Sequence, residues 1–333
     1  MSRIIPDELD EHALAEAVSL FGLDANSVRL IGFSQNYVYT AQGPQGKRIV
    51  RISTGRHQSY KQIESELKWI CWLGERGVKV ALPVRSRNSR FCEQLDYRAT
   101  SYLVTVFHHV PGRKPDHKDV SESFCERVGQ IIGQMQRAWT EANGLHIDRN
   151  GWRESRLLNE DLVTSIAPIS QGFRSSLQQL QDEVDSAVKD EQNYGLIHGD
   201  VNIGNIHIDH DRLWIFDFDN CEFGYFIQDL ATFLYDGIYC KLVNRTPADS
   251  LTEAVRIRWN GLIRGYREYG PLKEISSNTL RCFFLIRHAI IYVHYYRILS
   301  EEVLLKEREA LDRMKQDVEK RSHRLDFDKI VSI

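Results

Sequence analysis

At 333 residues, the chain is long enough for two modest domains or for two lobes that share a cleft. Hydrophobic residues make up 42% and charged residues 27%, as in an ordinary globular enzyme. The formal net charge of -3 shows no basic excess, so the composition gives no support to a nucleic-acid partner.

The cysteines and the apolar segments predict a cytoplasmic protein that does not enter a membrane. Six cysteines are scattered without a Cys-x-x-Cys pair, which argues against a zinc ribbon or a dense disulfide framework and favours a reducing cytosol. The acidic segment Met1 to Glu11 lacks the apolar stretch of a signal peptide. The most apolar segment, Cys282 to Leu299, contains ionisable residues such as Arg287 and His288, so it predicts a buried helix and not a membrane span.

The first hundred residues predict strands around one helix. Gly43-Pro44-Gln45-Gly46 is a strong turn signal and predicts a hairpin between the strands on either side of it. Apolar residues at helical spacing predict a helix over Tyr60–Leu73. Short segments rich in β-branched and aromatic residues predict strands at Val28–Phe33, Tyr37–Gln42, Lys47–Ile52 and Tyr102–Phe107.

Beyond Pro115 the pattern is mostly helical. One apolar face runs from Phe124 to Trp139, a second helix is predicted over Ser175–Lys189, and three more between Asp229 and Lys320. Three short apolar strands interrupt the helices, at Leu196–His198, Ile206–Ile208 and Leu213–Phe216. We therefore expect an α+β fold of two lobes, with a β-rich lobe over 1–107, a Pro-Gly hinge over 108–115 and a helical lobe over 116–333. Such a layout leaves a cleft between the lobes, which is a common place for a ligand site.

Three polar residues lie at the ends of the hairpin predicted within the helical lobe. They are Asp200, Asn205 and Asp217, and the strands beside them are otherwise apolar. A lone His-Gly-Asp is usually a turn, and an Asp at a strand end is usually a cap. Together, however, two carboxylates and an amide among apolar strands are costly to bury without a metal or a partner. A carboxylate base and hard oxygen ligands for Mg²⁺ are the groups that phosphoryl transfer requires.

This segment resembles the signature motif of the aminoglycoside phosphotransferase-like kinases, a superfamily that also contains choline kinases, homoserine kinases and SrkA-type Ser/Thr kinases. The motif reads His-x-Asp-x-x-x-x-Asn followed by Asp-Phe/Leu-Asp/Glu. It appears here as His198-Gly199-Asp200 through Asn205 and as Asp217-Phe218-Asp219, followed by Gly224 and Asp229-Leu230-Ala231. The form Phe216-Asp-Phe-Asp is closest to the homoserine kinase and SrkA-like branch. The resemblance implies a bilobal protein-kinase-like fold that uses ATP and Mg²⁺.

The resemblance also implies roles for these residues. Asp200 would be the catalytic base, and Asn205 and Asp217 would be the Mg²⁺ ligands. Asp229 would hydrogen-bond to the backbone of the catalytic loop. For Asp219 we expect a solvated position in preference to a place near a second metal.

In the β-rich lobe, the resemblance places the nucleotide against a loop and a strand. Ser34 and Asn36 occupy the place of the phosphate-covering loop, which lacks the Gly-rich spacing of protein kinases. Arg51 stands where many kinases have the phosphate-binding lysine, and strand alternation puts it on the same side as Ile49.

Two further contacts complete the predicted nucleotide site. The helix Tyr60–Leu73 should supply a carboxylate that holds Arg51; periodicity leaves Glu64 and Glu66 open, and the spacing of the family favours Glu66. The end of the strand Tyr102–Phe107 resembles the linker that pairs with adenine, with contacts at Phe107 and His109.

The function expected from these observations is transfer of the γ-phosphate of ATP to a hydroxyl of a small molecule, such as an amino alcohol or a hydroxy amino acid. The alternatives are a SrkA-type Ser/Thr protein kinase and an inactive kinase-fold scaffold. The acceptor pocket has only weak candidates: Trp152 with Arg153, and an aromatic and histidine stripe that includes Phe284 and His288. Such stripes are more often core. The sequence does not determine the oligomeric state.

Overall fold

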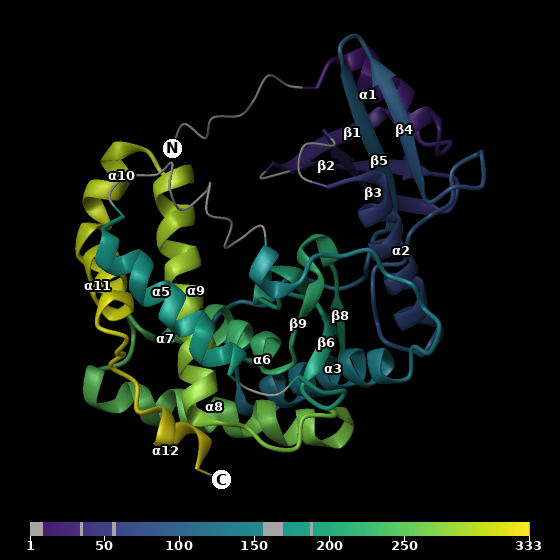
Figure 1. The fold of residues 1–333 in the computed structure, drawn as a ribbon. Helices are drawn as coiled ribbons and strands as arrows, with labels where there is room; N and C mark the ends of the chain where they lie inside the picture. Colours follow the sequence, from purple (N-terminus) through teal and green to yellow (C-terminus); the bar gives the residue numbers. More distant parts are fainter. Residues whose placement is uncertain (1–8, 34–35, 55–57, 156–168, 187–188, 333) are drawn as a thin grey trace.

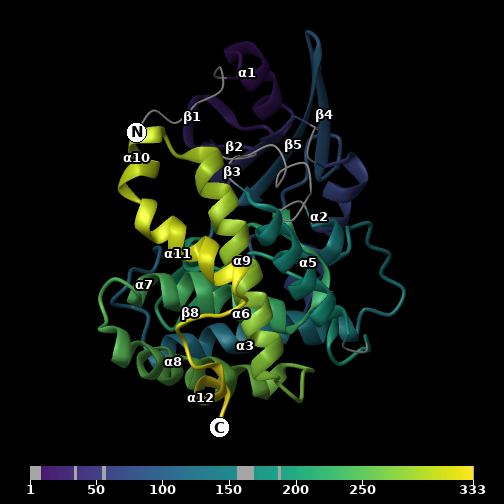
Figure 2. The ribbon, with the colours of Figure 1, turned by 60° about the vertical axis from the view of Figure 1, so that its left-hand side comes forward.

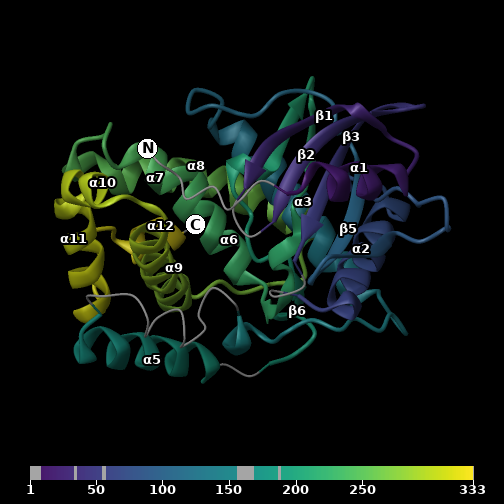
Figure 3. The ribbon, with the colours of Figure 1, turned by 90° about the horizontal axis from the view of Figure 1, so that it is seen from above.

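The computed structural model describes residues 9–33, 36–54, 58–155, 169–186 and 189–332. It has two lobes, one around a five-stranded antiparallel sheet and the other mainly helical (Figure 1). Seen from above, the sheet with α1 and α2 lies at one side of the molecule and α9 to α11 at the other (Figure 3). The protein therefore has the predicted bilobal α+β architecture.

The sheet of the first lobe packs against other elements on both of its faces, although one of its edge strands is largely exposed. Its strand order is β1-β2-β3-β5-β4, and its strands are β1 Asp24–Phe33, β2 Tyr37–Gly43, β3 Gly46–Ser53, β4 Cys92–Tyr97 and β5 Thr100–His108. On one face, Val50 and Ile52 of β3 pack in a core with α1 (Glu11–Ser19). On the other face, Ile49 packs towards α2 (Tyr60–Glu75) and the core of the helical lobe. Strand alternation thus places Ile49 and Arg51 on the α2 side, as predicted.

Helix α2 begins at a capping box, which fixes where the helix starts. The Ser59 hydroxyl accepts from the Gln62 amide at 3.2 Å, and the Gln62 side chain accepts from the Ser59 amide at 3.0 Å. The helix buries one apolar face that includes Ile63, Leu67 and Ile70. It is also tied to the helical lobe, because Trp72 donates its indole N–H to the Ala138 carbonyl at 3.0 Å.

The helical lobe is built on one packed pair of helices and one packed group of three. Its helices are α3 Glu122–Thr140, α5 Gln171–Asp185, α6 Ile227–Phe233, α7 Cys240–Leu242, α8 Ala248–Tyr269, α9 Ser277–Ile298, α10 Glu301–Lys306, α11 Arg308–Glu319 and α12 Phe327–Val331. Helices α3 and α8 approach so closely that a Cβ on Gly129 would overlap the Leu262 carbonyl, and one on Gly265 would overlap the Glu126 carbonyl. The long helix α9 lies between α5 and α11 (Figure 2).

Helix α9 confirms that the most apolar segment is a buried helix. Leu280, Phe284, Leu285 and Ala289 on it are almost fully inaccessible to solvent. No helix among the described residues is long and apolar enough to cross a membrane.

Two short antiparallel pairs lie where the lobes meet. The hairpin of β7 (Ile206–Asp209) and β8 (Arg212–Ile215) pairs with the hinge, because Arg113 and Ile208 exchange backbone hydrogen bonds of 3.0 and 2.8 Å. The strand β6 (Tyr194–Ile197) pairs with β9 (Glu222–Tyr225). Together they place the loop after β6 and the loop after β8 at the same edge of the helical lobe.

Several element predictions were wrong in detail. Helix α1 and the strands β4 and β9 were not predicted, and α5 begins at Gln171 and not at Ser175. The region from Asp229 to Lys320 contains α6 to α11 and a π-helical turn over Leu234–Tyr239, not three helices. Short strands such as β9 depend on a distant partner for their hydrogen bonds, so local composition marks them weakly.

Candidate active site

A cavity of about 410 Å³ lies between the two lobes. Its walls come from β1 to β3, α2, the end of β5, the hinge, and the loops around the hairpin of β7 and β8. Six of the predicted site residues line it: Arg51, Glu66, Phe107, His109, Asn205 and Asp217. The fold thus gathers residues that are up to 166 positions apart in the chain, as the numbers of Arg51 and Asp217 show.

Arg51 is held by the carboxylate of α2. Its Nη1 and Nη2 atoms donate to Glu66 Oε1 and Oε2 at 2.8 and 2.9 Å, and both side chains are buried. Periodicity left Glu64 and Glu66 open, and in the structure Glu66 makes the contact. Burial alone would lower the pKa of Arg51, but Glu66 and Asp219 outweigh it and raise the pKa.

Asp219 corrects one expectation, because it is buried and not solvated. Its carboxylate lies 3.7 Å from Nη1 of Arg51, and only 6% of the residue is exposed. The carbonyl of Asp219 accepts from the side chains of Gln58, at 2.6 Å, and of Arg149. These bonds turn the carboxylate inward, an orientation that the composition of the loop did not indicate.

The loop of the first motif is held by buried hydrogen bonds. Asp229 accepts from the backbone N–H groups of His198 and Gly199 at 3.0 and 2.9 Å, as predicted. Gly199 has φ 77°, and a Cβ there would overlap the Asn220 carbonyl, so the turn requires glycine. The buried His198 ring accepts from the Asp200 amide at 3.3 Å and contacts the Phe216 carbonyl at 3.2 Å. Burial lowers the pKa of His198, which keeps it a neutral structural residue.

Asp200 and Asn205 lie in direct contact at the end of this loop. The Asn205 amide nitrogen donates to the Asp200 carbonyl at 3.1 Å and to Oδ2 of its carboxylate at 3.3 Å. The amide thereby directs its nitrogen to Asp200 and leaves its carbonyl oxygen as a possible metal ligand. The other carboxylate oxygen, Oδ1, accepts from Nη2 of Arg287 at 2.7 Å.

Asp217 has the environment of a metal ligand. It has a left-handed backbone (φ 69°), which is uncommon for a residue with a side chain and recurs at functional sites. Burial, followed by repulsion from Asp219, raises the pKa of Asp217 to about 7, although Arg51 opposes the shift. A divalent cation would offset this charge, and a carboxylate with an amide oxygen from Asn205 fits the hard ligands that Mg²⁺ takes from proteins.

Part of the cavity wall is apolar and aromatic. Phe107 and His109 line it together with His207 and Phe216, which the sequence reasoning missed. Burial is the first cause that lowers the pKa values of His109 and His207, so both rings are neutral. The signal for His207 was present: it alternates with Ile206 and Ile208 on a short strand, so it faces the side opposite to them.

Some predicted residues are not part of the cavity. Ser34 lies outside the described residues. Asn36 is buried but is not among the residues that line the cavity. The acceptor candidates Trp152 and Arg153 were wrong, because the indole packs in the core and donates to Asp185, and Arg153 pairs with Asp185 at 2.6 Å.

Helix α9 contributes a different residue to the site from those that the sequence predicted. Phe284 and His288 are core residues of α9, but Arg287, next to His288 in the chain, reaches Asp200. Asp236, from the π-helical turn after α6, accepts from Nε and Nη2 of Arg287 at 2.9 and 2.5 Å. The sequence marked Arg287 only as a charge that interrupts an apolar segment, and it gave no sign of Asp236.

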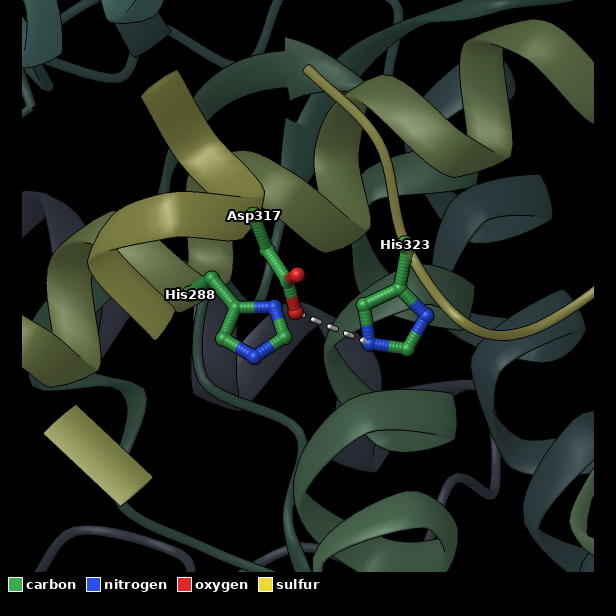
Figure 4. Close-up of side chains that lie close together, drawn as sticks. All are labelled: His288, Asp317 and His323. Carbon is green, nitrogen blue, oxygen red and sulfur yellow. Dashed lines mark ion pairs between the residues drawn. The ribbon is translucent and has the colours of Figure 1, made fainter. Parts of the chain in front are cut away.

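A second polar cluster, away from the residues that line the cavity, lies between α9 and α11. It consists of His288, Asp317 and His323, whose nearest side-chain atoms lie within 4.8 Å of one another (Figure 4). The Leu325 amide donates to Nδ1 of His323 at 3.0 Å, so the ring carries its proton on Nε2, the atom that faces Asp317 at 4.0 Å. At 4.0 Å these two atoms are too far apart for a hydrogen bond, and within the described residues none of Nε2 of His323, Oδ2 of Asp317 and Nδ1 of His288 has a hydrogen-bond partner.

A model of the phosphotransferase enzyme family, APH, matches residues 28–272 of the chain. The chain belongs to this family. Membership confirms the resemblance that the two motifs predicted. The protein is therefore an enzyme, a phosphotransferase with an alcohol group as acceptor.

Individual relatives of this phosphotransferase support the same class. Amicoumacin kinase of Bacillus subtilis (strain 168) is 26% identical over 316 residues, which are 93% of this chain and 92% of that protein. A solved amicoumacin kinase, in complex with AMP-PNP, Ca²⁺ and Ami, has a TM-score of 0.83 at 25% identity, over 98% of this chain and 97% of that one. A microcompartment-associated aminopropanol kinase shares the fold, with a TM-score of 0.70 at 19% identity over 93% and 97% of the chains. These relatives support a small-molecule phosphotransferase.

Proposed function

We propose that the enzyme transfers the γ-phosphate of ATP, with Mg²⁺, to a hydroxyl of a small amino alcohol or hydroxy amino acid. The observation that carries this is the grouping of Asp200, Asn205 and Asp217 beside a cavity whose other wall holds Arg51. A kinase that uses a nucleotide and a divalent metal is supported by the solved amicoumacin kinase, which binds AMP-PNP and Ca²⁺. The names of amicoumacin kinase and aminopropanol kinase support small acceptors.

In this proposal Asp200 is the base of the reaction. It accepts the proton of the acceptor hydroxyl while the oxygen forms a bond to the γ-phosphorus, and the bond from that phosphorus to its bridging oxygen breaks to leave ADP. Asn205 and Asp217 would hold Mg²⁺, which when bound offsets charge on the phosphates.

Arg51 would contact the phosphates in place of a lysine. Two of its nitrogens are engaged by Glu66, while its buried Nε has no hydrogen-bond partner within the described part of the chain. A buried donor without a partner is costly, and a phosphate oxygen would satisfy it. Asn36 and Ser34 would cover the phosphates from the loop between β1 and β2, and Phe107 and His109 would contact the adenine.

The lobe boundaries follow from the same proposal. Residues 1–107 would form the nucleotide lobe, residues 108–115 the hinge, and residues 116–333 the lobe that holds the catalytic and acceptor-binding groups. All six cysteines are free thiols, which suits the cytoplasmic location expected from the sequence.

The test is an acceptor screen with Mg²⁺ and ATP that includes aminopropanol, ethanolamine, homoserine, choline, kanamycin and a protein substrate. We expect turnover of an amino alcohol or a hydroxy amino acid, and a loss of at least about 100-fold in Asp200→Asn with little change in Mg·ATP affinity. Asp209→Asn, a carboxylate at the end of β7, serves as the control and should keep the activity.

Three outcomes would contradict the proposal. Turnover of kanamycin alone would make the enzyme an aminoglycoside kinase, and labelling of protein serines alone would favour a protein kinase. Unchanged turnover in Asp200→Asn would remove that residue from the role of base.

A further inference from the structure

Asp200 belongs to a chain of three buried charges that the proposed mechanism does not fully use. Nη2 of Arg287 donates both to Asp200 Oδ1, at 2.7 Å, and to Asp236 Oδ2, at 2.5 Å. The three side chains are 21%, 10% and 15% exposed, in the order Asp200, Arg287, Asp236, so they are largely but not completely shielded from solvent. We call this set the Asp-Arg-Asp array.

The array has one negative charge more than it can compensate internally. Two carboxylates share a single guanidinium, and burial is the first cause of the raised pKa of Asp236, with Asp200 adding to the repulsion. Lys241 is another positive charge that acts on Asp236, and it lowers the pKa of Asp236. Its effect is the smallest of those that act on this carboxyl, so it does not compensate the extra negative charge. A buried anion of this kind is stabilised by a cation that arrives with a ligand.

The array also has hydrogen-bonding capacity left over. Arg287 directs both Nε and Nη2 to the same oxygen of Asp236, Oδ2. Within the described residues, no hydrogen bond is made by Oδ1 of Asp236 or by Nη1 of Arg287. One carboxylate oxygen of Asp236 is therefore available to accept a hydrogen bond from a ligand. The guanidinium of Arg287 separates it from the carboxylate of the base Asp200.

The spacing fits a short ligand. Nη2 of Arg287 bonds Oδ1 of Asp200 at 2.7 Å and Oδ2 of Asp236 at 2.5 Å, so these two oxygens are at most about 5 Å apart. The oxygens left for a ligand, Oδ2 of Asp200 and Oδ1 of Asp236, belong to the same two carboxylates. A molecule that places a hydroxyl on one and a cation on the other therefore needs only a few carbons between these groups, as in short amino alcohols.

We propose that Asp236 binds the ammonium group of the acceptor. Arg287, which lies between Asp236 and Asp200, positions the carboxylate of the base Asp200. This inference rests on the proposed function and names its substrate class: short hydroxyl compounds that carry one primary amine. Arg287 occupies Oδ1 of Asp200, which leaves Oδ2, the oxygen beside Asn205, to receive the hydroxyl proton. The π-helical turn that carries Asp236 is a feature that recurs at functional sites.

The first experiment compares isopropanolamine with propylene glycol, which has the same skeleton with a hydroxyl in place of the amine. The quantity measured is the ratio of their kcat/KM values. We expect the wild type to prefer the amine, and Asp236→Asn to lower this ratio by about 10- to 100-fold, mainly through KM of the amine. Asp317→Asn is the matched control, since it removes a partly buried carboxylate beside α9 that is not in the array.

A second measurement does not depend on turnover. Propylamine has the amine of isopropanolamine but no hydroxyl, and it should inhibit the wild type in competition with isopropanolamine, whereas isopropanol should not. Asp236→Asn should weaken this inhibition by a similar factor. Equal inhibition of the two proteins by propylamine, or faster turnover of hydroxy acids than of amines by the wild type, would overturn the assignment.

Arg287 requires a readout that separates positioning from stability. Arg287→Met should lower kcat by about 10-fold or more with KM for Mg·ATP unchanged, and Arg287→Lys should recover part of kcat, because it keeps the charge but cannot bridge two carboxylates. Equal kcat in Arg287→Met and wild type would show that the base needs no such support.

The outcomes distinguish the two proposals. If the wild type phosphorylates no acceptor with Mg·ATP, the proposed function fails and the ammonium site fails with it. If the wild type phosphorylates an acceptor but Asp236→Asn keeps the wild-type preference for the amine, only the ammonium site is wrong. Melting temperatures of all variants check that each one is folded.

Discussion

At the residue scale, the site is a set of buried charges paired across distant segments. Arg51 pairs with Glu66, and Arg287 pairs with Asp200 and Asp236, so each guanidinium lies between carboxylates. Removing one member of a buried pair is costly because the other member is left as an isolated charge. Substitutions here should therefore be tested in pairs as well as singly.

The pair of Arg51 and Glu66 is suited to a double-mutant cycle. Arg51→Ala and Glu66→Ala should each raise KM for ATP, and their combined effect should be smaller than the sum, with a coupling of about 1 to 3 kcal/mol. Glu64→Ala is the control, since Glu64 lies on the same helix but not in the pair. Strict additivity, or a larger effect from Glu64→Ala, would contradict the role of Glu66.

Asp217 predicts a pH dependence of stability. Its pKa is about 7 in the folded, metal-free protein against an ordinary 3.8, so between these values the folded state holds a proton that the unfolded state has released. The free energy of unfolding therefore falls as the pH rises through this window. Asp217→Asn removes the titration and should stabilise the metal-free protein relative to wild type more at about pH 8 than at about pH 5. Because Asp217 is exposed and water screens its charge, we expect this difference to be about 1 kcal/mol.

Chemical denaturation of both proteins with EDTA at the two pH values measures this effect. Burial also raises the pKa of Glu222 to about 7. Glu222 titrates in both proteins, so its contribution cancels when their free energies of unfolding are subtracted. Adding Mg·ATP should stabilise the wild type and have little effect on Asp217→Asn. A difference that does not change with pH would show that Asp217 is ionised in the metal-free fold.

At the element scale, the helical lobe depends on the close contact of α3 and α8. Gly265→Ala would put a Cβ into the Glu126 carbonyl, which is backbone and cannot move aside. We expect a loss of about 2 to 4 kcal/mol in the free energy of unfolding, measured with urea. Gly172→Ala in α5, where the nearest atom would lie at an ordinary 3.7 Å, should be neutral or slightly stabilising. Equal stability of the two variants would mean that the helices can separate at little cost.

At the scale of the whole molecule, one hydrophobic core continues from one lobe into the other. Ile63, Leu67 and Ile70 of α2 belong to the same buried cluster as Phe124, Val128 and Phe284 of the helical lobe. The lobes should therefore unfold together, in one transition, and Mg with AMP-PNP at 100 times its Kd should raise stability by about 2.7 kcal/mol. Calorimetry with and without EDTA checks both points, and two separate transitions would show that the lobes are independent.

The sequence by itself predicted the residues of the nucleotide and metal half of the candidate site. His198 to Asn205 and Asp217 to Asp219 are contiguous motifs, so their residue types and spacing are visible without a fold. A turn signal predicted the hairpin of β2 and β3, periodicity predicted the helices α2 and α3, and apolar composition predicted the buried helix α9. The faces of β3 were also predictable, because the alternation of Ile49 and Arg51 with Val50 and Ile52 is a local property of a strand.

Only the tertiary structure decided which distant groups meet. Glu66 rather than Glu64 faces Arg51 because of the rotation of α2 against the sheet, and Asp219 is buried because Gln58 and Arg149 hold its backbone. Arg287 reaches Asp200 from a helix 87 residues further along the chain, and Asp236 joins it through a π-helical turn. Local propensity contains no information on such pairs, since their energy arises from burial and charge compensation between segments that are brought together only by folding.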